Sequence, residues 1–318
     1  MRRQGSSRRP SRGTIVGASV ATVAGAMLAF SAYMADKITR PRRIVPIAVH
    51  EIEPWLEAIT FHTADGLMLH GWYLPHAAPR AALVIAHGYA MNRGELLDLA
   101  RGMRALGYAV ILFDFRAHGA SEGTRSTIGF REAGDVAAAA RFLHAQPALA
   151  GCAIGAVGLS MGAVATIGAA VEEPLIAAIV SDSAYATLGA IAAGGLRLLF
   201  HLPPFPFAPL VIRFSEALTR ARIGAASPVA IVGQIAPRPI LFIHGSADRL
   251  IPLANAHALH AAAGEPKELW IIPGVAHASA YHQVQDEYLR HLDRFFTTTL
   301  PQATDAGEPT ASRAAQPR

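Results

Sequence analysis

Three residues whose side chains could together perform nucleophilic catalysis stand far apart in the sequence. Ser160 lies in "GAVGLSMGAVAT" (residues 155–166), Asp248 in "HGSADRLIP" and His277 in "PGVAHASA". A serine hydroxyl is a weak nucleophile near neutral pH, so it needs a base within hydrogen-bond reach and donors for the oxyanion. Histidine can be that base, and a carboxylate can orient its imidazole. These residue types indicate acyl transfer, if the fold brings them together.

The surroundings of Ser160 fit a sharp turn from a strand into a helix. The apolar run 153–159 precedes it, and a run of small apolar residues, 161–170, follows it. Gly158 and Gly162 suit such a turn, because a Cβ at either position would push strand and helix apart. A helix start also leaves N–H groups free near the serine. The short G-x-S-x-G pattern alone does not separate a nucleophile from an ordinary turn residue.

Strand-like and helix-like segments alternate from residue 56 to residue 300, which we interpret as one folded domain. Asp65-Gly66 predicts a hairpin between the first two strands, and hence an antiparallel sheet edge. The later strands are apolar throughout, which indicates a mostly parallel sheet with helices on both faces. The sequence therefore predicts an α/β fold with about eight strands, at 56–63, 67–75, 81–88, 108–115, 153–160, 175–182, 238–245 and 267–274.

The three candidate residues each follow one of these strands. The carboxyl ends of parallel strands lie at one edge of a sheet, where ligands bind. The chain order Ser160, Asp248, His277 is the order expected for a serine turn on such a sheet. Asp182, at the end of strand 175–182, is the rival to Asp248 as the carboxylate. Other polar residues near strand ends are interpreted as groups that order turns and loops: His87, Arg116, His118, Glu122 and His244.

Residues 184–236 interrupt the alternation of strands and helices. The segment is apolar, contains several prolines and carries aromatic residues, and it falls between two predicted strands. We interpret it as a lid-like insertion over the strand ends. Its aromatic and proline-rich part, 200–214, is equally compatible with a lid over the substrate and with a patch that faces a membrane.

The N-terminal region is distinct from the folded domain. Residues 1–13 are basic and predicted to be disordered, residues 14–35 form a predicted transmembrane signal anchor, and residues 36–55 are a linker. The uncharged run from Thr14 to Met34 would rise about 30 Å as a helix, enough to cross a bilayer. A cleaved signal peptide, with Ala29-Phe30-Ser31 as its cleavage site, is the alternative. A slight excess of arginines before the span favours an extracytoplasmic domain. Residues 301–318 are a predicted disordered tail.

Charge and cysteine content narrow the class of protein further. The net charge is +5, but residues 1–43 carry +8, so the remainder is mildly acidic. No basic stripe with aromatic residues favours nucleic acid as a partner. Cys152 is the single cysteine, which excludes an intrachain disulfide and a cysteine-based metal site. No metal-ligand spacing and no phosphate-binding loop appears, so we expect neither a metal nor a cofactor.

Residues 56–298 resemble the α/β-hydrolases of the serine-hydrolase superfamily, and most closely the S33/S9-like hydrolases of the Bem46-like group. The resemblance implies Ser160 as nucleophile, His277 as general base and then acid, and Asp248 as the group that orients the imidazole. It also implies an oxyanion hole formed by the backbone N–H groups of Tyr89 and Met161. The matching stretches are "TADGLMLHGWYLP", "VIAHGYAMNR", "FDFRAHGASEG", "GAVGLSMGA", "ILFIHGSADRLIP" and "GVAHAS".

The chain departs from the family pattern at one position after the fourth strand. Many relatives have Arg-Gly-x-Gly-x-Ser there, whereas this chain has Ala117 in place of the first glycine. We expect this to matter only if Ala117 adopts a positive φ, which glycine tolerates and alanine does not.

The expected function is that of a membrane-anchored serine hydrolase that cleaves a carboxylic ester through an acyl-enzyme on Ser160. A small-molecule or lipid-like acyl compound is the expected substrate, because the insertion is apolar. A serine nucleophile disfavours the haloalkane and epoxide branches of the fold, which use aspartate. Peptide or amide cleavage, acyl transfer to an alcohol and non-catalytic binding by a membrane-tethered protein all remain open, and the sequence does not indicate an oligomeric state.

Overall fold

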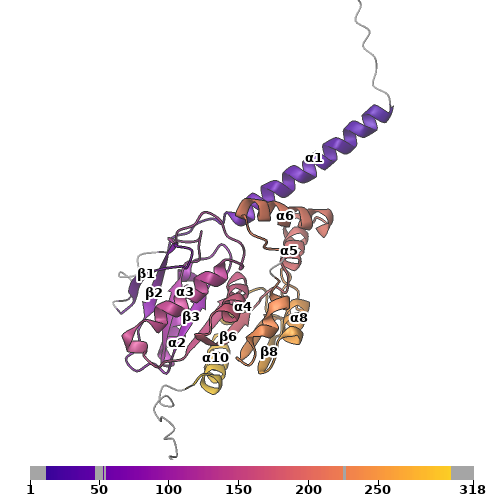
Figure 1. Ribbon diagram of the computed structural model, residues 1–318. Helices are drawn as coiled ribbons and strands as arrows, with labels where there is room; N and C mark the ends of the chain where they lie inside the picture. Colours follow the sequence, from indigo (N-terminus) through magenta and orange to yellow (C-terminus); the bar gives the residue numbers. More distant parts are fainter. Residues whose placement is uncertain (1–11, 47–52, 54, 225–226, 302–318) are drawn as a thin grey trace, which may run out of the picture.

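A single sheet of eight strands forms the centre of the protein. The structure is a computed structural model that describes residues 12–46, 53, 55–224 and 227–301. The strand order is β1-β2-β4-β3-β5-β6-β7-β8 (Figure 1). In chain order the strands are β1 (Glu57–His62), β2 (Met68–Leu74), β3 (Ala81–Ala86), β4 (Tyr108–Phe113), β5 (Ile154–Leu159), β6 (Ile176–Asp182), β7 (Ile240–Gly245) and β8 (Lys267–Ile272).

Strand directions agree with the expected fold class. β1 and β2 form the predicted antiparallel hairpin, and β2 also pairs antiparallel with β4. All other neighbouring strands run parallel. The prediction of a mostly parallel sheet with about eight strands and an antiparallel edge is therefore confirmed.

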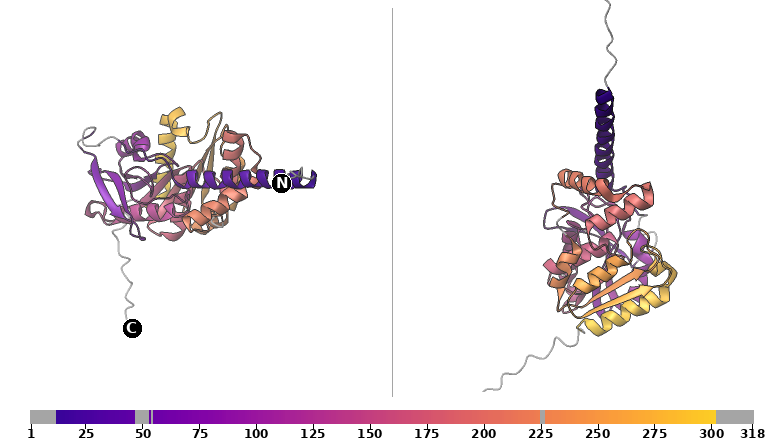
Figure 2. Two further views of the ribbon diagram at one scale, coloured as in Figure 1. Left: turned by 90° about the horizontal axis from the view of Figure 1, so that it is seen from above. Right: turned by 90° about the vertical axis from the view of Figure 1, so that its right-hand side faces the viewer.

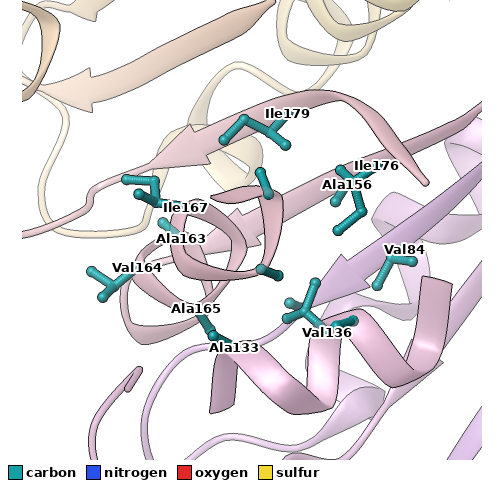
Figure 3. Close-up of a cluster of buried hydrophobic side chains, with 14 of the residues drawn as sticks. Val84, Ala133, Val136, Ala156, Ala163, Val164, Ala165, Ile167, Ile176 and Ile179 are labelled. Carbon is teal, nitrogen blue, oxygen red and sulfur yellow. The ribbon is translucent and has the colours of Figure 1, made fainter. Parts of the chain in front are cut away.

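Helices cover both faces of the sheet because its central strands are apolar on both sides. Every residue of β3, β4 and β5 is buried. On one face, Val84, Ala156 and Ile179 pack with helices α3 (Glu132–His144) and α4 (Met161–Glu172) (Figure 3). On the other face, alternate strand residues such as Leu83 and Ile85 pack with α2 (Leu97–Ala105) and α10 (Gln285–Thr299). The alternation follows from the two-residue period of a strand.

The helical segment that closes the domain, residues 280–299, is broken into two helices. It begins as the short α9 (Ala280–Gln283) and continues as α10. Val284 joins them with φ −133° and ψ 47°, which is not a helical conformation. The Val284 side chain packs against the core, so the break lies where the chain turns to cover the sheet.

The insertion between β6 and β7 is helical. It contains α5 (Leu188–Phe200), α6 (Pro204–Thr219) and the short α7 (Pro228–Ile231). Helix α8 (Ala254–Ala262) follows β7. Helices α5 and α6 lie together at the end of the domain from which α1 emerges (Figures 1 and 2).

Helix α1 (Arg12–Thr39) projects from the domain as a separate rod (Figure 2). From Ser19 to Ala26 every residue is exposed, whereas Phe30 packs edge-to-face on Phe200 of α5 and on Phe207 of α6. The helix continues through Thr39, into the segment that we expected to be a linker. Arg125 then fixes this end by hydrogen bonds to Asp36 and Thr39. The predicted disordered segments lie outside the described residues, apart from Arg12, Gly13 and Pro301.

Ala117 adopts the positive φ at which the departure from the family pattern matters. Its φ is 61°, in the loop that follows β4, and its side chain is buried. A left-handed conformation costs an alanine about 1–2 kcal/mol. The loop nevertheless holds it, since the Ala117 N–H donates to the Glu122 carbonyl oxygen at 2.8 Å.

This strain predicts that glycine is tolerated at position 117 without the usual cost. A buried alanine replaced by glycine loses about 0.8 kcal/mol for its methyl group and about 0.5–1 kcal/mol of backbone entropy. At Ala117 the relief of strain offsets both losses. We therefore expect the free energy of unfolding of Ala117→Gly to lie within about 0.5 kcal/mol of the wild-type value. Ala137, equally buried but in the middle of α3, is the matched control and should lose about 1–2 kcal/mol as Ala137→Gly. Denaturant unfolding measures both, and equal losses at the two positions would contradict the interpretation.

Candidate active site

The fold brings Ser160, His277 and Asp248 into one hydrogen-bonded row. His277 Nε2 lies 2.9 Å from Ser160 Oγ, and His277 Nδ1 lies 2.7 Å from Asp248 Oδ2. The three residues follow β5, β7 and β8, whose carboxyl ends share one edge of the sheet. The Asp248 carboxylate is fully buried, while the imidazole is about one-fifth exposed. A serine that faces a histidine held by a buried carboxylate can lose its proton as it attacks a carbonyl carbon.

The Asp248 carboxylate is fixed by its own loop. Its Oδ1 accepts the backbone N–H groups of Leu250 at 3.0 Å and Ile251 at 2.8 Å, which leaves Oδ2 for the imidazole. The Nδ1 hydrogen of His277 therefore points at Asp248, and Nε2 is left to accept from Ser160.

The turn at Ser160 is sterically closed around two glycines. A Cβ on Gly158 would lie 2.3 Å from the Gly162 carbonyl oxygen, and a Cβ on Gly162 would lie 2.3 Å from the Ala86 carbonyl oxygen. Ser160 itself adopts φ 53° and ψ −113°, a strained conformation for a residue with a side chain. Its N–H donates to the Asp182 carbonyl oxygen at 2.8 Å, which holds the turn in place.

The two residues expected to donate to an oxyanion, Tyr89 and Met161, line the same cavity as Ser160. Met161 is the first residue of α4, so its N–H has no acceptor within the helix. The loop after β3 approaches from the other side, since a Cβ on Gly88 would lie 3.6 Å from Ser160 Cβ. Within the described residues, no backbone hydrogen bond uses the N–H of the next residue, Tyr89. The N–H groups of Met161 and Tyr89 are therefore the candidates for oxyanion donors.

A cavity of about 330 Å³ lies over Ser160 and His277. Its wall is almost entirely apolar and comes mainly from α5, α6 and the loop after β3. Two further residues of the wall, Met34 and Ile38, belong to α1. The contribution of the N-terminal helix to this wall was not predictable from the sequence, because the hydropathy of a helix does not indicate which surface it contacts. Within the described residues, no group of three His, Cys, Asp or Glu side chains could hold a metal ion.

The chain is similar to known hydrolases over most of its folded part. Residues 77–203 match the family model described as serine aminopeptidase, S33. The uncharacterized protein Rv2307c of Mycobacterium tuberculosis is 31% identical over 243 residues, 76% of this chain and 79% of that protein. A monoacylglycerol lipase of Mycolicibacterium smegmatis is 26% identical, over 68% of this chain and 85% of the lipase. The solved structure of the Pyrococcus furiosus esterase Pf2001 matches with a TM-score of 0.71 at 25% identity, covering 83% of this chain and 99% of the esterase.

The chain belongs to the S33-like serine hydrolases. Its fold is the α/β-hydrolase fold, with esterases among the structures that it resembles. The resemblance expected from the sequence motifs is confirmed at the level of family, fold and class of enzyme.

Asp182, the rival carboxylate, lies close to the row of three residues but outside it. Its carboxylate accepts the hydroxyl groups of Ser183 at 2.8 Å and Tyr288 at 3.0 Å. Burial raises the pKa of Asp182 to about 6. The Ser183 hydroxyl in turn accepts the N–H of Ala278, the residue after His277. The carboxylate that His277 contacts is therefore Asp248.

The remaining polar residues near the strand ends form hydrogen bonds within loops. Arg116 pairs with the carboxylates of Asp135 and Asp65. His118 Nδ1 contacts the Arg116 carbonyl oxygen, and Glu122 accepts the Met68 N–H. His244 Nε2 contacts the Ile251 carbonyl oxygen at 2.8 Å, which helps to order the Asp248 loop.

His87 is a buried neutral histidine at the start of the loop after β3. Its Nδ1–H donates to the Gly88 carbonyl oxygen at 2.7 Å, and its Nε2 accepts the Phe115 N–H at 3.1 Å. Burial, followed by the charge of nearby His118, lowers the pKa of His87 to about 3. The neutral form alone satisfies both partners, since Nε2 must remain an acceptor.

This pKa predicts how the stability of the protein depends on pH. An unfolded histidine titrates near 6.5, so the stabilisation that neutral His87 provides is complete above that pH and is lost as the pH falls toward 3. The slope is at most about 1.4 kcal/mol per pH unit. We expect His87→Gln to be less stable than wild type at pH 7, and the difference to shrink by at least about 1 kcal/mol at pH 5. Denaturant unfolding of the full chain in detergent micelles measures the difference, and one that is independent of pH would contradict a neutral buried His87.

Proposed function

We propose that this protein is a membrane-anchored serine hydrolase that cleaves carboxylic esters of apolar acyl groups through an acyl-enzyme on Ser160. The observation that carries the proposal is the hydrogen-bonded row of Ser160, His277 and Asp248 beneath an apolar cavity. The names of two proteins similar to this chain, a monoacylglycerol lipase and an esterase, are consistent with it.

The positions of these atoms support the following reaction. Ser160 Oγ attacks the ester carbonyl carbon while His277 Nε2 takes its proton, and the N–H groups of Tyr89 and Met161 bind the oxyanion. The tetrahedral intermediate collapses as His277 gives the proton to the leaving alkoxide oxygen, which leaves an acyl group on Ser160. Water then attacks the acyl carbon, with its proton taken by His277. Collapse of this second intermediate returns the proton to Ser160 and releases the acid.

The lining of the cavity favours an ester with an uncharged acyl group. Apart from Ser160, His277, Ser215 and the two tyrosines Tyr89 and Tyr185, the lining residues are apolar, and none of them is Asp, Glu, Lys or Arg. An aminopeptidase must bind the charged α-amino group of its substrate, for which a carboxylate is the usual partner. Among the described residues that line this cavity, no such carboxylate is found, so the ester is favoured over the peptide.

The length and the packing of helix α1 support its retention as a permanent membrane anchor. Residues Ser19–Thr39 are long and apolar enough to cross a membrane. Cleavage near Ala29-Phe30-Ser31 would remove Phe30, which packs on both α5 and α6. We therefore favour retention of the helix, with the arginine-rich end in the cytoplasm and the hydrolase domain outside it.

Labelling with a fluorophosphonate probe tests the nucleophile. We expect wild type to be labelled covalently and Ser160→Ala to be unlabelled, with ester turnover reduced at least about 10⁴-fold. Ser183→Ala is the matched control, because Ser183 lies in the next strand-end loop, bonded to Asp182, and should keep the label. Labelling that persists in Ser160→Ala would contradict the assignment.

The two carboxylates near His277 predict unequal effects when each is neutralised. In Asp248→Asn the amide oxygen is needed by the Leu250 and Ile251 N–H groups, so an NH2 donor replaces the acceptor of the His277 Nδ1–H, and we expect kcat for a soluble ester to fall about 10³–10⁴-fold. Asp182→Asn changes a group bonded to Ser183 and Tyr288, and should lower kcat by less than about tenfold. Steady-state kinetics on both variants decides, and a larger loss for Asp182→Asn would assign the orienting role to Asp182 instead.

A further inference from the structure

Helix α1 contains the candidate membrane span, and its C-terminal end also lines the cavity over Ser160. Its last turns place Met34 and Ile38 in the wall that also contains Ser160 and His277. The two residues are one helical turn apart and therefore share a face of α1. Both are partly buried, in contrast to the exposed residues earlier in the helix.

The same end of α1 is attached to the loop of the candidate oxyanion donor. The Tyr89 hydroxyl donates to the Lys37 carbonyl oxygen at 3.2 Å, and Tyr89 also lines the cavity. On the opposite side, Arg125 bonds to Asp36 at 3.0 Å and to Thr39 at 2.6 Å. The position of α1 is thus fixed relative to Ser160 by polar contacts in addition to aromatic packing.

The length of the free part of α1 sets the depth of the domain in the membrane. The helical residues before Met27 rise about 22 Å, short of the roughly 30 Å of a hydrocarbon core. The remainder of the span is the stretch around Phe30, which packs on α5 and α6. If α1 crosses the bilayer, part of α5 and α6 must therefore lie at the depth of the acyl chains or the headgroups.

Helices α5 and α6 expose apolar side chains of the kind that this depth requires, alongside the exposed Arg197 and Arg213. Large apolar side chains are exposed there at Leu198, Leu199, Phe200, Phe205 and Leu218, with Leu199 67% and Phe205 79% exposed. Two of these five, Leu199 and Phe200, also line the cavity. The cavity wall thus shares residues with an exposed apolar surface, and the helices that carry this surface, α5 and α6, lie at the foot of α1 (Figures 1 and 2).

We propose that α1 anchors the protein in the membrane and also forms one wall of the pocket for the acyl chain. The substrate is then a lipid ester of the bilayer, whose acyl chain passes from the adjoining leaflet into the cavity between α1 and α5. Met34 and Ile38 then determine which chains fit. The inference rests on the proposed esterase function, which it deepens by naming where the substrate resides and which residues select it.

Selectivity for long chains tests the pocket wall. Full-length protein in phosphatidylcholine vesicles would be assayed with monooleoylglycerol in the bilayer and with p-nitrophenyl acetate in the water. We expect Met34→Trp and Ile38→Trp to lower the ratio of long-chain to short-chain kcat/KM at least tenfold, because the added ring volume fills the channel. Val23→Trp, on an exposed part of the same helix, is the matched control and should leave the ratio within about twofold.

The outcomes of this assay separate the two proposals. An unchanged ratio in Ile38→Trp, an equal fall in Val23→Trp, or wild-type turnover of the acetate without turnover of monooleoylglycerol would overturn the role of α1. Absence of both ester hydrolysis and fluorophosphonate labelling in wild type would instead overturn the esterase function.

Fluorescence quenching tests the depth independently of activity. Lipids that are brominated in their acyl chains quench tryptophans that lie among those chains. We expect the additional tryptophan emission of Phe205→Trp, relative to wild type with its native tryptophans, to be quenched by these lipids. Thr298→Trp, on the exposed surface of α10, should gain emission that these lipids do not quench. Equal quenching at the two positions, or none at Phe205→Trp, would overturn the entry of the chain from the membrane.

Discussion

The close backbone approach between the start of α4 and the end of β3 is the constraint on which the site depends. With no Cβ at Gly162, the Ala86 and His87 carbonyl oxygens pack directly against the first turn of α4, and with none at Gly158 the strand enters that turn without a clash. Ser160 is thereby held in a strained conformation with its hydroxyl at the edge of the sheet. The same approach brings the loop after β3, with Tyr89, beside the hydroxyl. The proposed nucleophile and the proposed oxyanion donors therefore depend on the same steric constraint.

The elements that build this edge were predictable because their signals are local. Each of these signals depends only on neighbouring residues. They are the continuous apolar strands such as β3 and β5, the Asp-Gly hairpin and the glycines beside Ser160. Parallel strands then place their following loops together whatever their separation in the chain. For that reason the residues that meet, Ser160, Asp248 and His277, could be named from sequence together with the roles expected of them, whereas the distances between them could not.

The features that sequence did not specify depend on tertiary contacts between distant segments. Asp182 and Asp248 both follow strands, and only packing shows that Asp182 is bonded to Tyr288 while Asp248 reaches the imidazole. The contribution of Met34 and Ile38 to the cavity depends on where α1 leaves the domain, which hydropathy does not encode. The aromatic segment 200–214 was equally compatible with a lid and with a membrane-facing patch. In the structure its residues belong to both the wall of the cavity and the exposed apolar surface beside α1.

Direct observation of the covalent intermediate tests the central claim, that Ser160 carries the acyl group. Full-length protein would be mixed with a long-chain p-nitrophenyl ester, quenched with acid within milliseconds and digested, and its peptides would be weighed by mass spectrometry. The account predicts that the peptide containing Ser160 gains the mass of the acyl group, and that this mass disappears as turnover is completed. Ester hydrolysis without any acylated Ser160 peptide, or with the acyl group on another residue, would contradict it.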